Sequence, residues 1–149
     1  MIGIVVAAHN DLAGALVQTA RLVVGTEVPV VALAIDATDS STEDDIKLRQ
    51  AIAEADRGGG VLVLTDMFGG TPSNVGMTMH DPGRVEVLTG VNLPMLIKAL
   101  QLTESNGELT AVAQSVKGAG QRSIVVASEI LVPAQPQAGG STPQGEPST

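Results

Sequence analysis

Short apolar runs alternate along the chain with segments in which apolar residues recur every three or four positions. The runs, rich in Val, Ile and Leu, predict buried strands over residues 2–8, 29–35, 60–65 and 85–89. The periodic segments predict helices over residues 12–24, 42–56, 71–79, 93–102 and 108–117. Because the strands are apolar throughout and alternate with helices, we predict an α/β fold whose mostly parallel sheet is covered by helices on both faces.

The end of the chain has a different pattern. An apolar run at residues 123–132 follows Gly118 and Gly120, which we interpret as a break after the last helix, and it predicts a fifth strand at a sheet edge. From residue 133 the composition changes to Pro, Gly, Ser, Gln and Thr with one charged residue. We therefore predict a single domain over residues 1–132 and a flexible tail over residues 133–149.

Composition excludes several classes of function. The 149 residues are 44% hydrophobic, which is enough for a core, and 16 acidic against 8 basic residues give a net charge of −8. This balance disfavours nucleic acid and anionic membranes as partners. No apolar run approaches the roughly 20 residues of a membrane span, so we expect a cytoplasmic protein without membrane insertion. Cysteine is absent and Phe68 is the single aromatic residue, which excludes thiolate chemistry and base-stacking platforms.

Polar or glycine-rich segments follow three of the predicted strands, at residues 8–11, 65–74 and 90–94. Ligands of open parallel sheets bind beyond the carboxyl ends of the strands, near the point where the strand order reverses. If the order is 2-1-3-4, the first and third strands are neighbours. His9 and Asp66 then lie side by side at the edge of the sheet.

A histidine paired with a carboxylate has a defined chemistry. A neutral imidazole is nucleophilic at one nitrogen only, and a carboxylate that accepts a hydrogen bond from the other nitrogen fixes the tautomer. If the Asp66 carboxylate accepts a hydrogen bond from Nδ1–H of His9, the lone pair of Nε2 is left free to attack. Gly69 and Gly70 would let the backbone come close to a ligand.

The next predicted helix adds an anion site to this pair. Thr71 is expected to cap it, Pro72 to be its first helical residue, and the free N–H groups near Ser73 to point to the same region. An imidazole, an orienting carboxylate and a phosphate cradle together predict a histidine phosphoryl carrier. This chemistry requires neither a metal nor an organic cofactor.

Other polar residues have simpler interpretations. Asn92 is expected to cap the helix over 93–102, and His80 to be a surface residue without function. The methionines at positions 67, 77, 79 and 95 are expected to fill the core. An acidic stretch lacks the calcium-loop pattern, so we predict that its members are solvated: Asp36, Asp39, Asp44 and Asp45.

At these residues the chain resembles the IIA component of the mannose-type branch of the bacterial phosphoenolpyruvate:sugar phosphotransferase system. The resemblance covers residues 1–132 and rests on the strand that ends in His9, on Asp-Met-Phe-Gly-Gly-Thr-Pro-Ser-Asn at 66–74, and on Gly-Val-Asn-Leu-Pro-Met at 90–95. It implies a doubly wound sheet of order 2-1-3-4. It also implies a homodimer whose subunits exchange the antiparallel fifth strand.

The resemblance also implies roles for individual residues. His9 would be phosphorylated at Nε2, Asp66 would bind its other nitrogen, and Thr71 would contact the phosphoryl group. HPr would donate that group and a IIB protein, separate here, would accept it, for sugar uptake or its regulation. The sequence departs from the family at Asn10, where glycine is frequent; we place Asn10, Phe68 and Asn92 in loops that border the site or face a partner.

Two other functions compete with this one. The phosphotransfer subunit of a dihydroxyacetone kinase system shares the fold and the early histidine, but its third-strand loop lacks the Gly-Gly-Thr-Pro pattern. A receiver-like switch would use Asp66 as phosphoacceptor. It would need more acidic residues after the first strand and a lysine after the fifth, and residues 121–132 contain no lysine.

Overall fold

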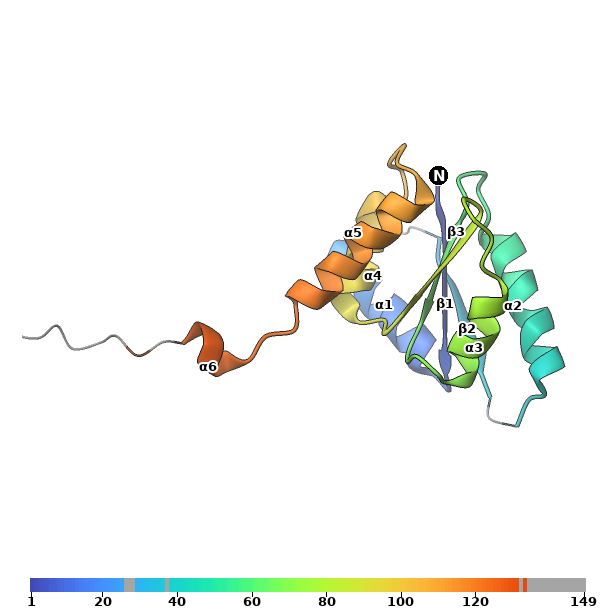
Figure 1. The fold of residues 1–149 in the computed structure, drawn as a ribbon, viewed down its shortest axis with the longest axis horizontal. Helices are drawn as coiled ribbons and strands as arrows, with labels where there is room; N and C mark the ends of the chain where they lie inside the picture. The colour runs from blue at the N-terminus through green and yellow to red at the C-terminus, as the bar shows by residue number, and fades with distance from the viewer. Residues whose placement is uncertain (26–28, 37, 132, 134–149) are drawn as a thin grey trace, which may run out of the picture.

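A computed structural model describes residues 1–25, 29–36, 38–131 and 133 of the chain. Its centre is a parallel four-stranded sheet in the order β2-β1-β3-β4, with helices on both faces (Figure 1). The predicted fold class and strand order are thereby confirmed. The elements are β1 (Gly3–His9), α1 (Leu12–Val24), β2 (Val31–Ile35), α2 (Ser41–Ala55), β3 (Val61–Thr65), α3 (Thr71–Thr78), β4 (Val85–Thr89), α4 (Leu93–Leu102), α5 (Leu109–Arg122) and α6 (Ala127–Ile130).

The sheet separates two hydrophobic cores. Successive residues of a strand point to opposite faces. Ile4 and Leu62 belong to the core under α1, α4 and α5, whereas Val5 and Val63 belong to the core under α2 and α3. The two central strands β1 and β3 are therefore buried on both sides, which explains why their sequences are apolar throughout.

The last long helix differs from its prediction. We expected it to end at residue 117, before a glycine break, but α5 continues through Gly118 and Gly120 to Arg122. A Cβ atom on Gly120 would lie 2.4 Å from Cγ of Met95, and the Gly120 carbonyl accepts a 3.4 Å hydrogen bond from the Asn92 side chain. Gly120 thus lets α5 pack closely on the start of α4 and does not interrupt the helix.

The predicted fifth strand is not formed by the described part of residues 123–132. Residues 123–126 have no regular structure, and Ala127–Ile130 form the short helix α6. Every residue from Gln121 to Leu131 is exposed, and the segment runs away from the sheet (Figure 1). A strand needs a neighbour that pairs its N–H and C=O groups, and no strand among the described residues pairs with this segment. Val132 and residues 134–149 of the predicted tail lie outside the described residues.

Candidate functional site

His9 is the last residue of β1, at the carboxyl-end edge of the sheet, and is flanked by β2 and β3. By the alternation along β1 its side chain lies on the same face as Val5 and Ala7, the face that α2 and α3 cover. The imidazole nevertheless keeps 37% of its surface exposed. His9 is thus held by a buried strand and remains open to a partner.

Asp66 follows β3 directly and contacts the histidine, as the sequence predicted. Its Oδ2 atom lies 2.6 Å from Nδ1 of His9 and accepts a second hydrogen bond, 3.0 Å long, from the backbone N–H of His9. Oδ1 accepts the N–H of Met67 at 2.9 Å. Both carboxylate oxygens therefore have partners, and the carboxylate cannot rotate without losing three hydrogen bonds.

These hydrogen bonds determine the charge of Asp66. Partial burial alone would raise the pKa of its carboxyl, but the N–H groups of His9 and Met67 and the His9 ring outweigh burial, so the pKa lies below its ordinary value. At neutral pH Asp66 is ionised and can only accept hydrogen bonds, so the hydrogen between the two side chains belongs to Nδ1. In a neutral ring the free lone pair is then on Nε2.

Gly70 borders the imidazole on the side of α3. A Cβ atom at this position would lie 3.0 Å from Cε1 of His9 and 3.1 Å from Cγ of Met67. Cε1 lies between the two ring nitrogens, so this backbone approaches the ring at the edge that carries Cε1. Gly69 has a φ of +83°, a conformation that favours glycine. A Cβ at Gly69 would meet no atom within 4 Å, so the predicted close backbone approach is found at Gly70, whereas Gly69 serves the turn.

The start of α3 differs by one residue from its prediction. The N-cap is Gly70 and not Thr71, because the Gly70 carbonyl accepts the first helical hydrogen bond, from Asn74 N–H at 2.9 Å. Thr71 and Pro72 are the first two helical residues. Since Pro72 has no N–H, the donors available in this turn are the N–H groups of Thr71 and Ser73. The exposed Thr71 adds a hydroxyl group beside them.

Ser73 has a different place from the one expected. Its side chain is fully buried, and its hydroxyl accepts a 3.4 Å hydrogen bond from Gly69 N–H. The side-chain amide of Asn74 donates to the Gly69 carbonyl, also at 3.4 Å. The Ser73 hydroxyl thus stabilises the glycine turn from the protein interior and does not face the open side of the site.

Exposed residues surround the histidine. Phe68 and Met67 are 76% and 56% exposed, and Leu12 is exposed at the start of α1. Met67 and Met77 were expected in or near the core, but both are exposed, whereas Met79 and Met95 are buried as expected. Asn10 follows His9 with a φ of +49°, a left-handed conformation that glycine and asparagine tolerate best. This conformation explains how Asn10 can occupy a position where glycine is also suitable. The sequence pattern gave no sign that Leu12 and Met67 are exposed; their exposure follows only from the structure.

Asn92 and His80 have the structural places predicted for them. The Asn92 side chain accepts the N–H of Met95 at 3.0 Å and so caps α4, beyond the neighbouring strand β4. The side chain of His80 is 46% exposed, with Nε2 3.6 Å from a carboxylate oxygen of Glu86. Neither residue contributes a contact to the pair of His9 and Asp66.

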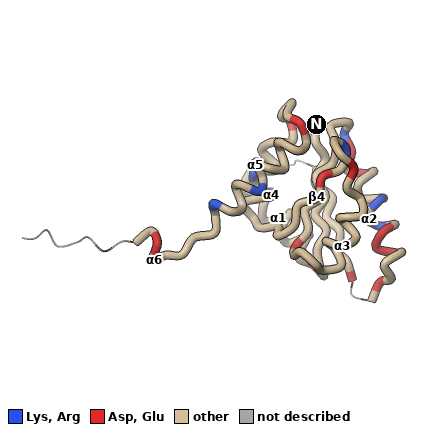
Figure 2. The backbone as a smooth tube through the Cα atoms, in the orientation of Figure 1, with Lys and Arg blue, Asp and Glu red and all other residues tan. Residues whose placement is uncertain are grey.

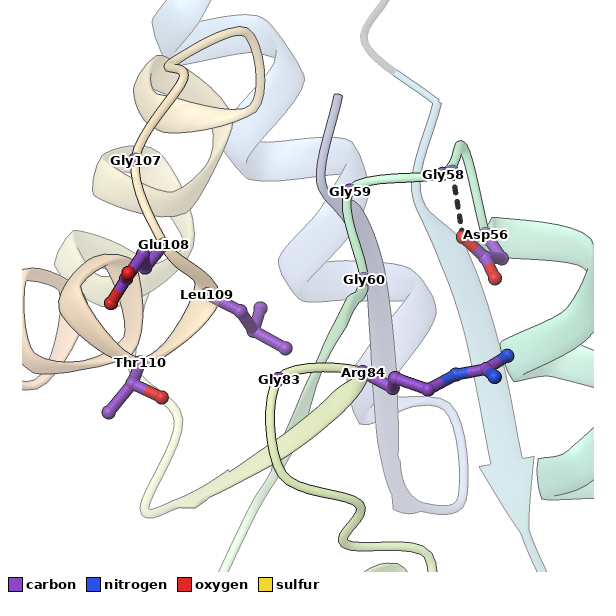
Figure 3. A pocket seen from close by; sticks show the side chains of 10 residues that line it. All are labelled: Asp56, Gly58, Gly59, Gly60, Gly83, Arg84, Gly107, Glu108, Leu109 and Thr110. Carbon is purple, nitrogen blue, oxygen red and sulfur yellow. Dashed lines mark hydrogen bonds between the residues drawn. The ribbon is translucent and has the colours of Figure 1, made fainter.

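A cavity of about 630 Å³ lies at the opposite edge of the sheet, where the strands begin (Figure 3). The segments before β3, β4 and α5 form it, and its walls are mostly backbone. It is remote from His9, so its size does not make it part of the site. Its lining residues are Asp56, Gly58, Gly59, Gly60, Gly83, Arg84, Gly107, Glu108, Leu109 and Thr110.

The described part of the chain contains neither a metal-binding cluster nor a membrane-spanning helix. No group of three or more His, Asp or Glu side chains there is arranged to hold a metal ion. Within the same residues, no helix combines the length and the apolar character needed to cross a membrane.

Comparisons with known proteins agree in sequence and in structure. The profile of the family described as "PTS system fructose IIA component" matches residues 3–117. The fructose-specific EIIA component of Bacillus subtilis is 30% identical over 132 residues, which are 88% of this chain and 90% of the relative. The mannose-specific EIIAB component of Escherichia coli K12 is 31% identical over 116 residues, 75% of this chain but only 36% of the relative.

The solved structures give the same result. The phosphotransferase system component EIIA of Streptococcus agalactiae superposes with a TM-score of 0.77 at 27% identity, covering 87% of this chain and 99% of that one. The mannose/sorbose-specific IIA subunit of Enterococcus faecalis has a TM-score of 0.73 at 26% identity, covering 83% and 92%.

Proposed function

The chain belongs to the mannose- and fructose-type IIA family of the phosphotransferase system, and from this we propose that it is a phosphocarrier in which His9 accepts and releases a phosphoryl group. One observation carries the proposal. The 2.6 Å contact of Nδ1 with an ionised Asp66 leaves the nucleophilic lone pair on Nε2, in a ring that is 37% exposed. A buried histidine could not reach a second protein, and an unoriented one would transfer phosphoryl groups more slowly.

The transfer step follows from this geometry. The Nε2 lone pair attacks the phosphorus atom of a phosphohistidine on the donor, a new N–P bond forms, and the donor N–P bond breaks in line. The electron pair of that bond returns to the donor imidazole. The His9 ring keeps its Nδ1–H and becomes a phosphorylated imidazolium, whose positive charge faces the Asp66 carboxylate. Transfer to the acceptor reverses these bond changes at His9.

The first turn of α3 is proposed to bind the transferred group. Gly70 leaves room beside the ring, and the N–H groups of Thr71 and Ser73 lie at the positive end of the helix dipole. The Thr71 hydroxyl supplies a further donor. These groups would stabilise the charge on the phosphoryl oxygens as it is transferred.

HPr is the proposed donor and a separate IIB protein the proposed acceptor, both in the cytoplasm. Support for a IIB partner comes from the Escherichia coli relative, whose name joins the A and B components in one protein and of which this chain matches 36%. The exposed Phe68, Met67 and Leu12 next to His9 form an apolar rim on which a partner protein can pack. The carrier would serve sugar uptake or its regulation.

A homodimer is proposed from the free edge of the sheet. β4 is an edge strand, and a groove of about 390 Å³ along it is lined by residues that include Met77, Val87 and Lys117. Residues 123–131 expose five large apolar side chains, which an isolated chain would leave in water: Ile124, Val125, Val126, Ile130 and Leu131. A second copy of this segment can pair with the edge of β4 and cover both surfaces.

The receiver-like alternative fits the site less well. An aspartate that accepts a phosphoryl group must present a free oxygen, but both oxygens of Asp66 are engaged by hydrogen bonds from His9 and Met67. The dihydroxyacetone kinase alternative would use the same histidine, but the family matched by residues 3–117 is the sugar system.

The proposal is tested by phosphorylation with phospho-HPr. We expect the wild-type chain to form an adduct that is lost in acid but survives alkali, as phosphohistidine does. His9→Ala should accept no phosphate, and His80→Ala, which removes the other histidine, should behave like wild type. Labelling of His9→Ala at the normal rate, or an adduct that is lost in alkali, would contradict the proposal.

A further inference from the structure

Asp44 is buried, although the sequence predicted a solvated residue. It lies in the first turn of α2, and its residue exposure is 0%. The buried face of α2 is otherwise apolar and consists of Leu48, Ala51 and Ala55. Neither carboxyl oxygen of Asp44 has a hydrogen-bond partner among the described residues. A carboxylate in this position would be desolvated without compensation, which is strongly unfavourable.

Local sequence explains why the chain buries this residue. The capping box of Ser40 and Glu43 fixes where α2 begins, with hydrogen bonds of 2.8 Å and 3.3 Å between the two residues. Within the helix, Asp44 lies four positions before Leu48, and residues at this spacing lie on the same face. Asp44 is therefore on the side of α2 that faces the sheet. The rest of the first turn is exposed or half-buried. Asp44 is thus the single residue of that turn inside the protein.

The charges around Asp44 do not favour its ionised form. Asp39, Glu43 and Asp36 surround it, and acidic residues gather over this end of α2 (Figure 2). Lys47 is the nearby cation, but it forms an ion pair with Asp39. Among the elements that α2 packs against, β2, β3 and α3 contain no titratable side chain and β1 contains one, His9. Burial first, and then the neighbouring acids, raise the pKa of Asp44 above its ordinary value.

We propose that the first turn of α2 is a proton-linked switch, closed while Asp44 is protonated and released from the sheet when Asp44 ionises. Release of this turn breaks few other interactions, because the turn buries no other side chain and its capping hydrogen bonds are exposed to solvent. The same turn borders α3 across a groove lined by Ser41, Asp45, Asn74, Val75 and Thr78. Release therefore uncovers the side of α3, whose first turn lies beside His9.

Proton linkage fixes the direction of the effect. The closed form binds the Asp44 proton more tightly than the open form, in which the carboxyl has its ordinary pKa. The open population therefore rises with pH, by up to tenfold per pH unit, between the ordinary pKa and the raised pKa of the closed form. Above the raised value it levels off, and below the ordinary value the turn stays closed.

Amide hydrogen exchange resolved by NMR tests this switch on the full chain. In the wild type, the open population calculated from exchange at residues 43–47, after correction for intrinsic rates, should rise with pH across that window. Amides at the other end of α2 should not follow. In Asp44→Asn the rise should vanish, because an amide does not titrate. Asp45→Asn, a neighbouring acid with a partly exposed side chain paired with Arg49, should keep it.

A direct measurement makes the test independent of the variants. The carboxyl-carbon resonance of Asp44 in the wild type should titrate above the ordinary pKa of an aspartate, together with the exchange of residues 43–47. An ordinary titration of Asp44, or first-turn exchange that does not change with pH, would overturn the proposal. These wild-type data decide the matter even if Asp44→Asn does not fold.

Discussion

Oδ2 of Asp66 accepts hydrogen bonds from both the ring Nδ1 and the backbone N–H of His9, at 2.6 Å and 3.0 Å. One oxygen thus fixes the position of the strand end and the orientation of the ring. The two residues are 57 positions apart in sequence, and the adjacency of β1 and β3 brings them together. The proposed phosphoryl transfer relies on this contact to orient the ring.

Replacing Asp66 by asparagine should slow phosphoryl transfer by about 10- to 100-fold, the usual effect of losing a group that orients a reactive histidine. The amide is uncharged, so it neither fixes the Nδ1–H tautomer nor stabilises the phosphorylated imidazolium. The rate of labelling by phospho-HPr measures the effect, with far-UV circular dichroism to confirm folding. Asp81→Asn, at an exposed position, is the matched control. An unchanged rate in Asp66→Asn would remove Asp66 from the mechanism.

Acid should weaken the native state through Asp66. Because its pKa is lowered on folding, the carboxylate stabilises the protein above the ordinary value of about 3.9, and this contribution is lost as pH falls through the folded-state pKa. Urea midpoints of wild type and Asp66→Asn should therefore differ at pH 6 and converge below pH 3.9. Circular dichroism is the suitable probe, because the chain has no Trp or Tyr. If the difference between the two urea midpoints instead grew on acidification, Asp66 would not stabilise the protein as a carboxylate.

Thr71 and Ser73 should respond differently to loss of their hydroxyl groups. Thr71→Val keeps the shape of an exposed side chain, so we expect slower transfer at unchanged stability. Ser73→Ala removes the buried partner of Gly69 N–H and should cost about 1 kcal/mol of unfolding free energy. Labelling rates and urea unfolding of both variants separate these effects. The reverse pattern would mean that Ser73, and not Thr71, contacts the phosphoryl group.

Gly70→Ala should disturb the imidazole directly. Its Cβ would lie 3.0 Å from Cε1 of His9, so the ring or the loop has to move, and transfer should slow at least tenfold. The NMR signal of the Cε1 proton should shift as well. The matched control is Gly14→Ala, inside α1 with open space for a Cβ, which should stabilise the fold by up to about 1 kcal/mol and leave transfer unchanged. An unshifted ring signal and a normal rate in Gly70→Ala would contradict the close approach.

Charge in the apolar segment should abolish the proposed dimer. Ile124→Asp together with Val126→Asp should give a monomer in sedimentation at micromolar concentration, where wild type should be a dimer. An aspartate buried against β4 of a second chain would lose its hydration without a partner. Ile46→Asp, at an exposed position on α2, is the control and should remain dimeric. A wild-type protein that is monomeric at these concentrations would exclude the dimer.

The local pattern of apolar and capping residues was sufficient to predict several helices and strands and part of the candidate site. The predicted limits of α1, β4 and α4 agree with the structure, and Asn92 caps α4 as expected, because helix capping depends on residues three positions apart. The pairing of His9 with Asp66 could be predicted only after a strand order was assumed. Given that order, the position of each residue at the end of its strand was enough.

Four features depended on packing that the sequence pattern does not contain. Gly120 continues α5 because it fits against Met95, and the inward direction of Ser73 follows from a helix that begins one residue earlier than expected. Asp44 is buried because it lies one turn before Leu48 on the inner face of α2, and this position overrides its polarity. Residues 123–131 carry a strand-like pattern but form no strand, since backbone pairing requires an edge that the segment does not reach in one chain. The sequence by itself thus determined the four strands of the sheet, the helices between them, and that His9 and Asp66 each lie at a strand end. Only the tertiary structure decided which polar groups are enclosed, because enclosure depends on neighbours distant in the chain.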